Sequence, residues 1–269
     1  MLTNPTAYGG KVEDSFDVIV PSIPGFGFSE RIGMTSSAIA NLWAGLMTDT
    51  LGYKRFAAAG GDVGSNVTKA LALQHSGVVS AIHLTDVGYP TGKEDFSTMT
   101  EAEQQFAGFI QGWWFMEGAY AMLQMTKPQS IAFGLNDSPV GLAAWMLSFV
   151  NTGAKDNLIE EAFGGRDELL TNLMIYWVTE TAGSAARTYL EDARAGFSQE
   201  GEPKPEARSS VPAGIALFPR EAQFPREWAE RSLNVQRFTK MPRGGHFAAL
   251  EEPELFASDL RASFRELHK

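Results

Sequence analysis

The stretch FAAAGGDVGSNVTKALALQHSG, residues 56–77, decides the fold that this sequence predicts. A short apolar run ends in two glycines, and apolar residues at helical spacing follow almost at once. Buried strands read as short apolar runs and helices as 3.6-residue periodicity, so the stretch predicts a strand, a tight turn and a helix. Asp62 stands at the tip of the turn, with Gly60 two residues before it and Gly64 two residues after it.

Strands and helical patterns alternate through the first part of the chain. FDVIVPSIPGFGFS (16–29) predicts a buried strand that runs into a Pro/Gly-rich loop, and VVSAIHLTDVG (78–88) predicts another strand. Between them, residues 35–53 predict a helix that is capped by Thr35 or Ser36. This alternation indicates a mostly parallel sheet of the α/β class.

The pattern changes to helices alone over residues 95–205. Two long segments there, EAEQQFAGFIQGWWFMEGAYAMLQM and DELLTNLMIYWVTETAGSAARTYLEDA, carry apolar residues at helical spacing, and the polar connector SQEGEPKPEARSS (198–210) follows them. Two apolar strands and an amphipathic helix come afterwards. We therefore expect an α/β core in two parts, 1–94 and 206–269, interrupted by a helical cap over 95–205.

A strand, a G-x-nucleophile-x-G turn and a helix together form a nucleophile elbow. The turn predicted at residues 60–64 would leave no room for side chains at its two glycines and would display Asp62 at the top of the sheet. The helix N-terminus beside it favours negative charge. An aspartate in a Gly-rich turn can also be an ordinary helix cap, so the assignment depends on the partners of Asp62.

Elbow enzymes supply their partners in the chain order nucleophile, acid, histidine. Glu221 follows a predicted strand, and His246 lies in the glycine loop MPRGGHFAAL after the next one, where sheets of this class carry out chemistry. Of the other histidines, His75 lies near a helix C-terminus, His83 lies within an apolar strand, and His268 lies at the chain end. We therefore favour His246 as the base.

Two residues compete for the role of the acid. Glu221 is favoured because it fits the chain order, whereas Asp86 follows the strand AIHLT and is the alternative.

Composition excludes several other classes of function. The chain has 269 residues, a formal net charge of −10, no cysteine and four histidines, none of them spaced as in a metal motif. No secretory signal and no membrane-spanning run is visible. We expect a soluble, cytoplasmic protein that contains no metal and no cofactor. We also expect that it binds neither nucleic acid nor membranes. The sequence leaves open whether it forms a homo-oligomer.

Several motifs resemble those of the microsomal-type epoxide hydrolases of the α/β-hydrolase superfamily: GGDVGSNVT, TKPQSIAFGLNDSPVGLAAW, IYWVTETAGSAARTY and MPRGGHFAALEEPELFASDL. The resemblance runs from about residue 3 to 266. It implies Asp62 as nucleophile, Glu221 as acid and His246 as base, with Tyr120 and Tyr189 of the cap holding the epoxide oxygen. Spacing alone would not favour these two tyrosines over Tyr176.

The implied chemistry answers why a carboxylate stands at the elbow. A carboxylate with a pKa near 4 is already ionised at neutral pH, so Asp62 could attack a small apolar epoxide directly and form an ester. Phenols could protonate the alkoxide, and His246 could then activate water against the ester. The family implies a role in detoxification.

Two departures from the family pattern are visible. Val63 stands where the family usually has tryptophan, although its backbone N–H remains available as an oxyanion donor. The H-G-x-P loop that supplies the second donor is not in the sequence. We therefore expect a truncated chain with an internal start at Met1, lacking its N-terminal strands, in which the ester is hydrolysed slowly. Losing one such donor costs about 10²–10³ in rate.

Two other functions remain open at this point. One is a hydrolase similar to the haloalkane dehalogenases, with the same aspartate nucleophile. The other is a non-catalytic remnant that binds apolar ligands.

Overall fold

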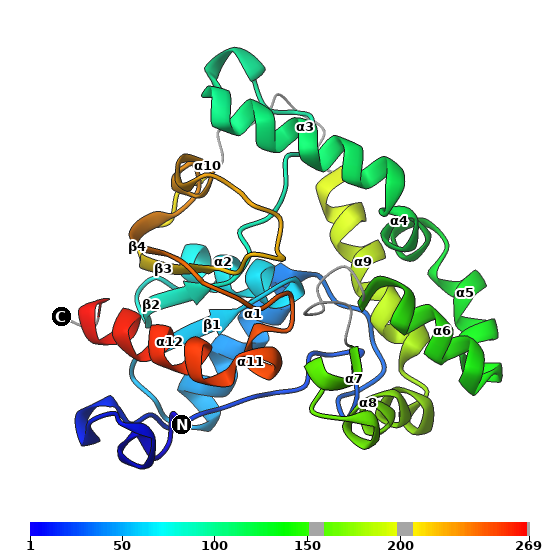
Figure 1. Ribbon diagram of the computed structural model, residues 1–269, viewed down its shortest axis with the longest axis horizontal. Helices are drawn as coiled ribbons and strands as arrows, with labels where there is room; N and C mark the ends of the chain where they lie inside the picture. The colour runs from blue at the N-terminus through cyan, green and yellow to red at the C-terminus, as the bar shows by residue number, and fades with distance from the viewer. Residues whose placement is uncertain (151–158, 198–206, 268–269) are drawn as a thin grey trace.

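The computed structural model describes residues 1–150, 159–197 and 207–267, and its described strands form one parallel sheet (Figure 1). The strand order is β1-β2-β3-β4, and β2 pairs with β3 in the register Ile82↔Ala213. The strands are β1 (Phe56–Gly60), β2 (Val79–Leu84), β3 (Pro212–Leu217) and β4 (Asn234–Lys240). The predicted parallel sheet is confirmed, and it joins segments from the two ends of the chain.

Helices cover both faces of this sheet. On one face α2 (Val63–Gln74) packs against β1 and β2, and α1 (Ser36–Gly45) packs against α2. On the other face α12 (Pro253–Leu267) packs against β2 and β3. The main core lies on the first face, and a smaller apolar cluster lies under α12. Helix α1 begins where the sequence predicts, because the Thr35 side chain accepts a hydrogen bond from the Ala38 N–H.

The chain segment that connects β2 to β3 forms a group of helices, which lies to one side of the sheet (Figure 1). It comprises α3 (Glu101–Met116), α4 (Ala119–Thr126), α5 (Pro128–Asp137), α6 (Pro139–Val150), α7 (Ile159–Ala162), α8 (Arg166–Thr179) and α9 (Ala182–Phe197). The remaining short elements are η1 (Pro5–Tyr8), η2 (Val12–Asp14), η3 (Leu46–Thr50, a π-helical turn), η4 (Phe96–Thr98), α10 (Arg226–Glu230) and α11 (Ala248–Glu251).

The two long helical patterns each form two helices rather than one. The first breaks at Glu117 and Gly118, between α3 and α4. The second breaks at Glu180, whose φ of 53° is left-handed and ends α8 before α9 begins. The predicted connector 198–210 lies largely outside the described residues.

The strand predicted within 16–29 is wrong. Residues 15–23 form no strand, and Val18, Ile19 and Val20 are 40%, 40% and 85% exposed. A strand exists only when its backbone groups pair with a neighbouring strand, and β1 pairs with β2 alone among the described strands. The apolar composition of this segment is typical of a strand, but composition cannot supply the partner.

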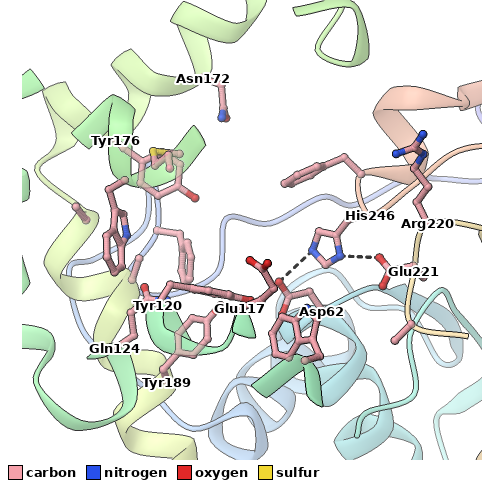
Figure 2. A pocket seen from close by; sticks show the side chains of 18 of the residues that line it. Asp62, Glu117, Tyr120, Gln124, Asn172, Tyr176, Tyr189, Arg220, Glu221 and His246 are labelled. Carbon is pink, nitrogen blue, oxygen red and sulfur yellow. Dashed lines mark hydrogen bonds and ion pairs between the residues drawn. The ribbon is translucent and has the colours of Figure 1, made fainter. Parts of the chain in front are cut away.

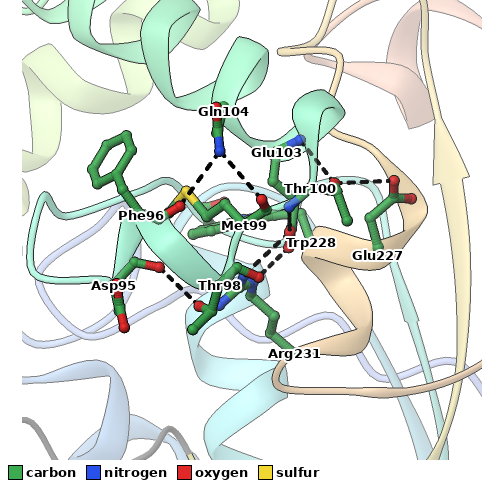
Figure 3. A network of polar contacts seen from close by, with 11 residues as sticks. Asp95, Phe96, Thr98, Met99, Thr100, Glu103, Gln104, Glu227, Trp228 and Arg231 are labelled. Carbon is green, nitrogen blue, oxygen red and sulfur yellow. Dashed lines mark hydrogen bonds and ion pairs between the residues drawn. The ribbon is translucent and has the colours of Figure 1, made fainter.

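Polar contacts attach the cap to the core at its first helix (Figure 3). Glu103 of α3 is buried and accepts hydrogen bonds from Arg231, which follows α10, with an Nε–Oε1 distance of 2.5 Å. Glu103 also completes a capping box with Thr100 at the start of the same helix. A second attachment joins α9 to α1, where Asp192 accepts from the Ser36 N–H at 2.7 Å and from its hydroxyl at 2.6 Å. Both ends of the cap are therefore fixed to the core.

Candidate active site

The turn between β1 and α2 has the strained backbone that a nucleophile elbow requires. Asp62 has φ 52° and ψ −125°, a conformation that L side chains rarely adopt. A Cβ on Gly60 would overlap the carbonyl oxygen of Gly64, so a side chain is excluded there. A Cβ on Gly64 would meet nothing within 4 Å, so the predicted collision at the second glycine is wrong. The close approach of the two backbones, rather than crowding at both glycines, makes the turn tight.

The structure brings Asp62, His246 and Glu221 into one hydrogen-bonded row (Figure 2). His246 Nε2 lies 3.2 Å from Asp62 Oδ2, and His246 Nδ1 lies 2.6 Å from Glu221 Oε1. Glu221 is buried, whereas the Asp62 side chain is 52% exposed. The three residues come from loops that follow β1, β3 and β4, at the carboxyl ends of parallel strands. The row therefore has the geometry of a nucleophile, a base and an orienting acid.

Two carboxylates keep a proton on His246. Burial alone would lower the pKa of His246, but hydrogen bonds to Asp62 and Glu221, together with their charges, raise it well above its usual value. With a proton on each ring nitrogen, the imidazolium donates to both carboxylates. Removing either negative charge would lower the pKa of His246 again.

The loop that carries His246 is held by Glu251, a residue that the sequence analysis does not identify. Its carboxylate accepts a hydrogen bond from the Phe247 N–H at 2.9 Å, and α11 places it one helical turn after that residue. The spacing H-F-x-x-x-E in the sequence is the signal that could have indicated it. Glu251 fixes the backbone on which the imidazole is mounted.

Cap and core enclose a cavity of about 580 Å³ in front of Asp62 (Figure 2). Its wall carries Asp62, Glu221 and His246 on one side and Tyr120, Tyr176 and Tyr189 of the cap on the other. Apolar side chains make up much of the rest, including Phe26, Ile110, Trp113, Leu135, Trp145 and Phe163. An apolar molecule bound here would lie between the carboxylate and the phenols.

The field of Asp62 reaches all three phenols. Burial, followed by the charges of Asp62 and Glu221, raises the pKa of Tyr120 to about 12. Burial and then the Asp62 charge also raise the pKa values of Tyr176 and Tyr189. The phenols therefore keep their protons at neutral pH. The geometry brings Tyr176 to the cavity as well, so it does not by itself choose between the three.

Asp86, the alternative acid, is buried close to the site, but the recorded acid partner of His246 is Glu221. Its Oδ1 accepts a hydrogen bond from the Gly88 N–H at 2.9 Å. Burial, offset in part by that bond and reinforced by the charge of Glu221, raises the pKa of Asp86 to about 6. In the folded chain Asp86 thus keeps its proton up to about pH 6, whereas in the unfolded chain it releases that proton near pH 4.

We expect Asp86→Asn to stabilise the chain at pH 8 but not at pH 4. An acid whose pKa is raised by folding destabilises the native state increasingly as pH rises from 3.8 to about 6, a cost of about 3 kcal/mol that is fully present above pH 6. An asparagine keeps the acceptor for Gly88 and carries no charge. Thermal unfolding at both pH values measures the effect, and Asp137→Asn, at an exposed position, controls for the loss of one charge. Equal destabilisation at both pH values would contradict the prediction.

Neither a metal site nor a membrane span is found in the described part of the chain. Over residues 1–150, 159–197 and 207–267 no group of three or more His, Asp or Glu side chains could hold a metal ion. Within the same ranges no helix combines the length and the apolar composition needed to cross a bilayer.

Comparisons with known proteins find relatives of similar sequence and fold. A model of the alpha/beta hydrolase fold family matches residues 11–152. The "Putative epoxide hydrolase" of Stigmatella aurantiaca is 40% identical to the chain, in an alignment that covers 99% of this chain and 60% of the relative. Epoxide hydrolase 1 of Sus scrofa is 36% identical, with 97% of this chain and 62% of the relative covered.

A solved structure shows the same likeness. The epoxide hydrolase of Aspergillus niger superposes with a TM-score of 0.73 at 28% identity, and the match covers 92% of this chain and 63% of that one. The chain spans about 60% of the length of the curated relatives it matches.

Proposed function

Because the chain belongs to an epoxide hydrolase family of the α/β-hydrolase superfamily, we propose that it opens epoxides to vicinal diols through a covalent ester at Asp62. The observation that carries the proposal is the placement of the Asp62–His246–Glu221 row on one wall of a cavity whose other wall presents phenols. A carboxylate that faces protonated phenols suits a substrate that must be attacked at carbon and protonated at oxygen.

In the first step, a carboxylate oxygen of Asp62 attacks a ring carbon of the epoxide. The C–O bond of the ring breaks, and its electron pair stays on the oxygen as an alkoxide. Tyr120 and Tyr189 bind this oxygen and one of them gives it a proton, so that a hydroxyl group forms. The product is a neutral ester of Asp62 that carries a β-hydroxyl.

Formation of the ester prepares His246 for the second step. The ester has no negative charge, so one of the two groups that raise the pKa of His246 is lost. The imidazolium, oriented by Glu221, can then return a proton through solvent to the phenolate that ring opening leaves, and the neutral imidazole takes a proton from water. The hydroxide adds to the acyl carbon of the ester, and the Val63 N–H stabilises the resulting oxyanion. The acyl C–O bond breaks, and the imidazolium protonates the departing alkoxide to give the diol. Asp62 then passes its remaining proton to His246, which restores the carboxylate and the imidazolium.

The cavity supports a small apolar epoxide as the substrate. Aromatic and aliphatic side chains form most of its wall away from Asp62, and water is the second reactant. No cofactor takes part in the steps proposed.

We also propose that the chain is divided into a core (1–94 and 206–269) and a cap (95–205). A cytoplasmic location is proposed as well. The cap helices and the cavity they share with the core support the division. The boundary near residue 205 lies outside the described residues.

Diol formation by the purified chain tests the proposed function. Incubation with styrene oxide should yield phenylethanediol, detected by chromatography, faster than in buffer alone. Incubation with a chloroalkane tests a dehalogenase instead through the release of chloride. Chloride release without diol formation would replace the proposal with a dehalogenase activity. If neither product forms, a binding function remains.

The three cavity tyrosines are expected to differ when each is replaced by phenylalanine. Tyr120→Phe and Tyr189→Phe should each slow ring opening by about 10²-fold, because each removes a hydroxyl that stabilises the alkoxide. Tyr176→Phe should change the rate by less than about 3-fold, since the proposal gives it no contact with the alkoxide. Rates of ester formation in single turnovers measure the effect. A large loss in Tyr176→Phe alone would move the acid to that residue.

A further inference from the structure

Two polar side chains of α8 line the cavity and take no part in the steps proposed so far. Asn172 and Tyr176 lie four residues apart, so both fall on the same face of that helix, and both are half-buried. Figure 2 shows both side chains directed into the cavity from the cap, apart from the Asp62–His246–Glu221 row. These two residues, the α8 pair, form a polar spot on a wall that is otherwise largely apolar.

The polar ends of the α8 pair face the cavity without a partner in the described part of the chain. Among the residues that the structure describes, none forms a hydrogen bond with the Asn172 carboxamide or with the Tyr176 hydroxyl. The ring of Tyr176 is held by apolar neighbours, including an edge-to-face contact with Phe26 at a centroid distance of 6.5 Å. The ring is therefore fixed, and its hydroxyl remains available to a bound molecule.

A substrate that is hydrocarbon throughout would leave the α8 pair unsatisfied. A polar group in an open cavity can bond to water, but a substrate that fills the cavity displaces that water. A polar group that loses its hydrogen bond in this way costs free energy, whereas a substrate that supplies the bond avoids the cost. The α8 pair therefore favours a substrate that carries a polar group of its own.

A carbonyl oxygen suits the α8 pair. At neutral pH the Tyr176 hydroxyl keeps its proton and can donate, and the carboxamide of Asn172 can donate as well. A carbonyl oxygen has two lone pairs, so it can accept a hydrogen bond from each of two donors. A group that can only donate would leave the Tyr176 proton without an acceptor.

The charges of the cavity wall favour a neutral carbonyl over a carboxylate. Among the described residues that line the cavity, the carboxylates outnumber the cationic groups: Asp62, Glu117 and Glu221 against Arg220 and His246. An anion bound here would add a further negative charge to this wall, and like charges disfavour one another. A neutral ester or amide carbonyl accepts the same hydrogen bonds without that cost.

We propose that the α8 pair is a subsite for a neutral carbonyl group, so that the preferred substrates are apolar epoxides that carry such a group away from the ring. This assignment rests on the proposed function, in which the epoxide ring lies at Asp62. It gives Asn172 and Tyr176 a role in selecting the substrate and none in the chemical steps.

Matched pairs of epoxides test the subsite. Methyl esters of ω-epoxy acids, from epoxyhexanoate to epoxydodecanoate, are each compared with the terminal epoxide of an alkane of the same length. At the length that places the carbonyl at α8, the ester should have the larger kcat/KM by about 10-fold, the effect of one hydrogen bond. A series in which no ester is preferred would overturn the proposal. So would a preference for the free acids that Arg220→Gln abolishes, because the subsite would then be one for anions.

Variants of the α8 pair should act on the two substrates in different ways. Asn172→Leu and Tyr176→Phe should each lower kcat/KM for the preferred ester by about 10-fold. Neither should slow hydrolysis of the alkane epoxide, and Asn172→Leu should raise its kcat/KM by about 3-fold, because no carboxamide is then left unsatisfied. Asn136→Leu, the same change at an exposed position of α5, should alter neither value. Equal losses on both substrates would assign the pair to the packing of the cap and overturn the proposal.

Binding to a chain that cannot form the covalent ester keeps this inference distinct from the proposed function. In Asp62→Asn, calorimetric titration should show that the preferred ester binds about 10-fold more tightly than the alkane epoxide of the same length. Adding Asn172→Leu should remove this difference. Equal binding of the two compounds to Asp62→Asn would refute the subsite even if the unaltered chain forms diols. Failure of the unaltered chain to form a diol from any of these epoxides would refute the proposed function, whatever the binding shows.

Discussion

Replacing Asp62 with asparagine is expected to abolish covalent labelling by an epoxide and to lower diol formation by roughly 10⁴-fold or more. The amide oxygen carries no charge and is a poor nucleophile, whereas its size and its place at the elbow are unchanged. Intact-mass spectrometry after exposure to styrene oxide should show a mass increase equal to one epoxide in the unaltered chain. Peptide mapping should place that increase on the segment after β1.

Asp86→Asn is the matched control for this experiment. It makes the same chemical change in a second aspartate, which is buried and lies at the carboxyl end of the next strand. It should leave the label in place, because Asp86 makes no contact with the epoxide in the mechanism proposed. An adduct that persists in Asp62→Asn would show that another nucleophile acts, and the proposed function would fail.

Replacing His246 with glutamine should preserve the covalent labelling that Asp62→Asn abolishes. Ring opening does not need a base, so the ester should form at a rate within about 10-fold of the unaltered chain. Hydrolysis needs the imidazole, so each chain should stop at the ester of its first turnover, and the steady-state rate of diol formation should fall by about 10⁴-fold. Rapid mixing followed by mass spectrometry would show the adduct accumulating to one per chain.

The source of the oxygen atoms in the diol tests the proposed role of His246 in hydrolysing the ester. If water attacks the acyl carbon, a single turnover in ¹⁸O-labelled water places the label on Asp62 and leaves the first diol unlabelled. Label in that first diol would mean that His246 directs water to the epoxide itself, without an ester. Glu221→Gln should resemble a weaker form of His246→Gln, whereas Asp86→Asn should hydrolyse the ester normally. This comparison decides which acid orients the imidazole.

Features that depend on neighbours along the chain were correctly predicted from the sequence. The elbow at Asp62 needs only a strand, a glycine at position 60 and a helix, all within about twenty residues. Helix α1 and the parallel strand β2 follow equally from local pattern and capping. His83 lies within the predicted apolar strand, and it is fully buried beside Asp259.

Features that depend on partners distant in sequence were predicted less well. Residues 16–29 have the composition of a strand but form none, because no described strand lies beside them. The helical patterns indicated helices but not the breaks near Gly118 and at Glu180. Glu251 did not stand out, since it matters only through the Phe247 backbone N–H that it contacts.

The sequence alone therefore determined the elbow, the order of the candidate groups and the class of fold, because these depend on residues that are close together along the chain. Only the tertiary structure decided that His246, 184 residues after Asp62, reaches it, and that Glu221 rather than Asp86 is its recorded acid partner. The same structure also placed the phenols opposite the carboxylate. The physical reason is that hydrogen bonds and charges act over a few ångströms of space, and only chain folding determines which distant residues come that close.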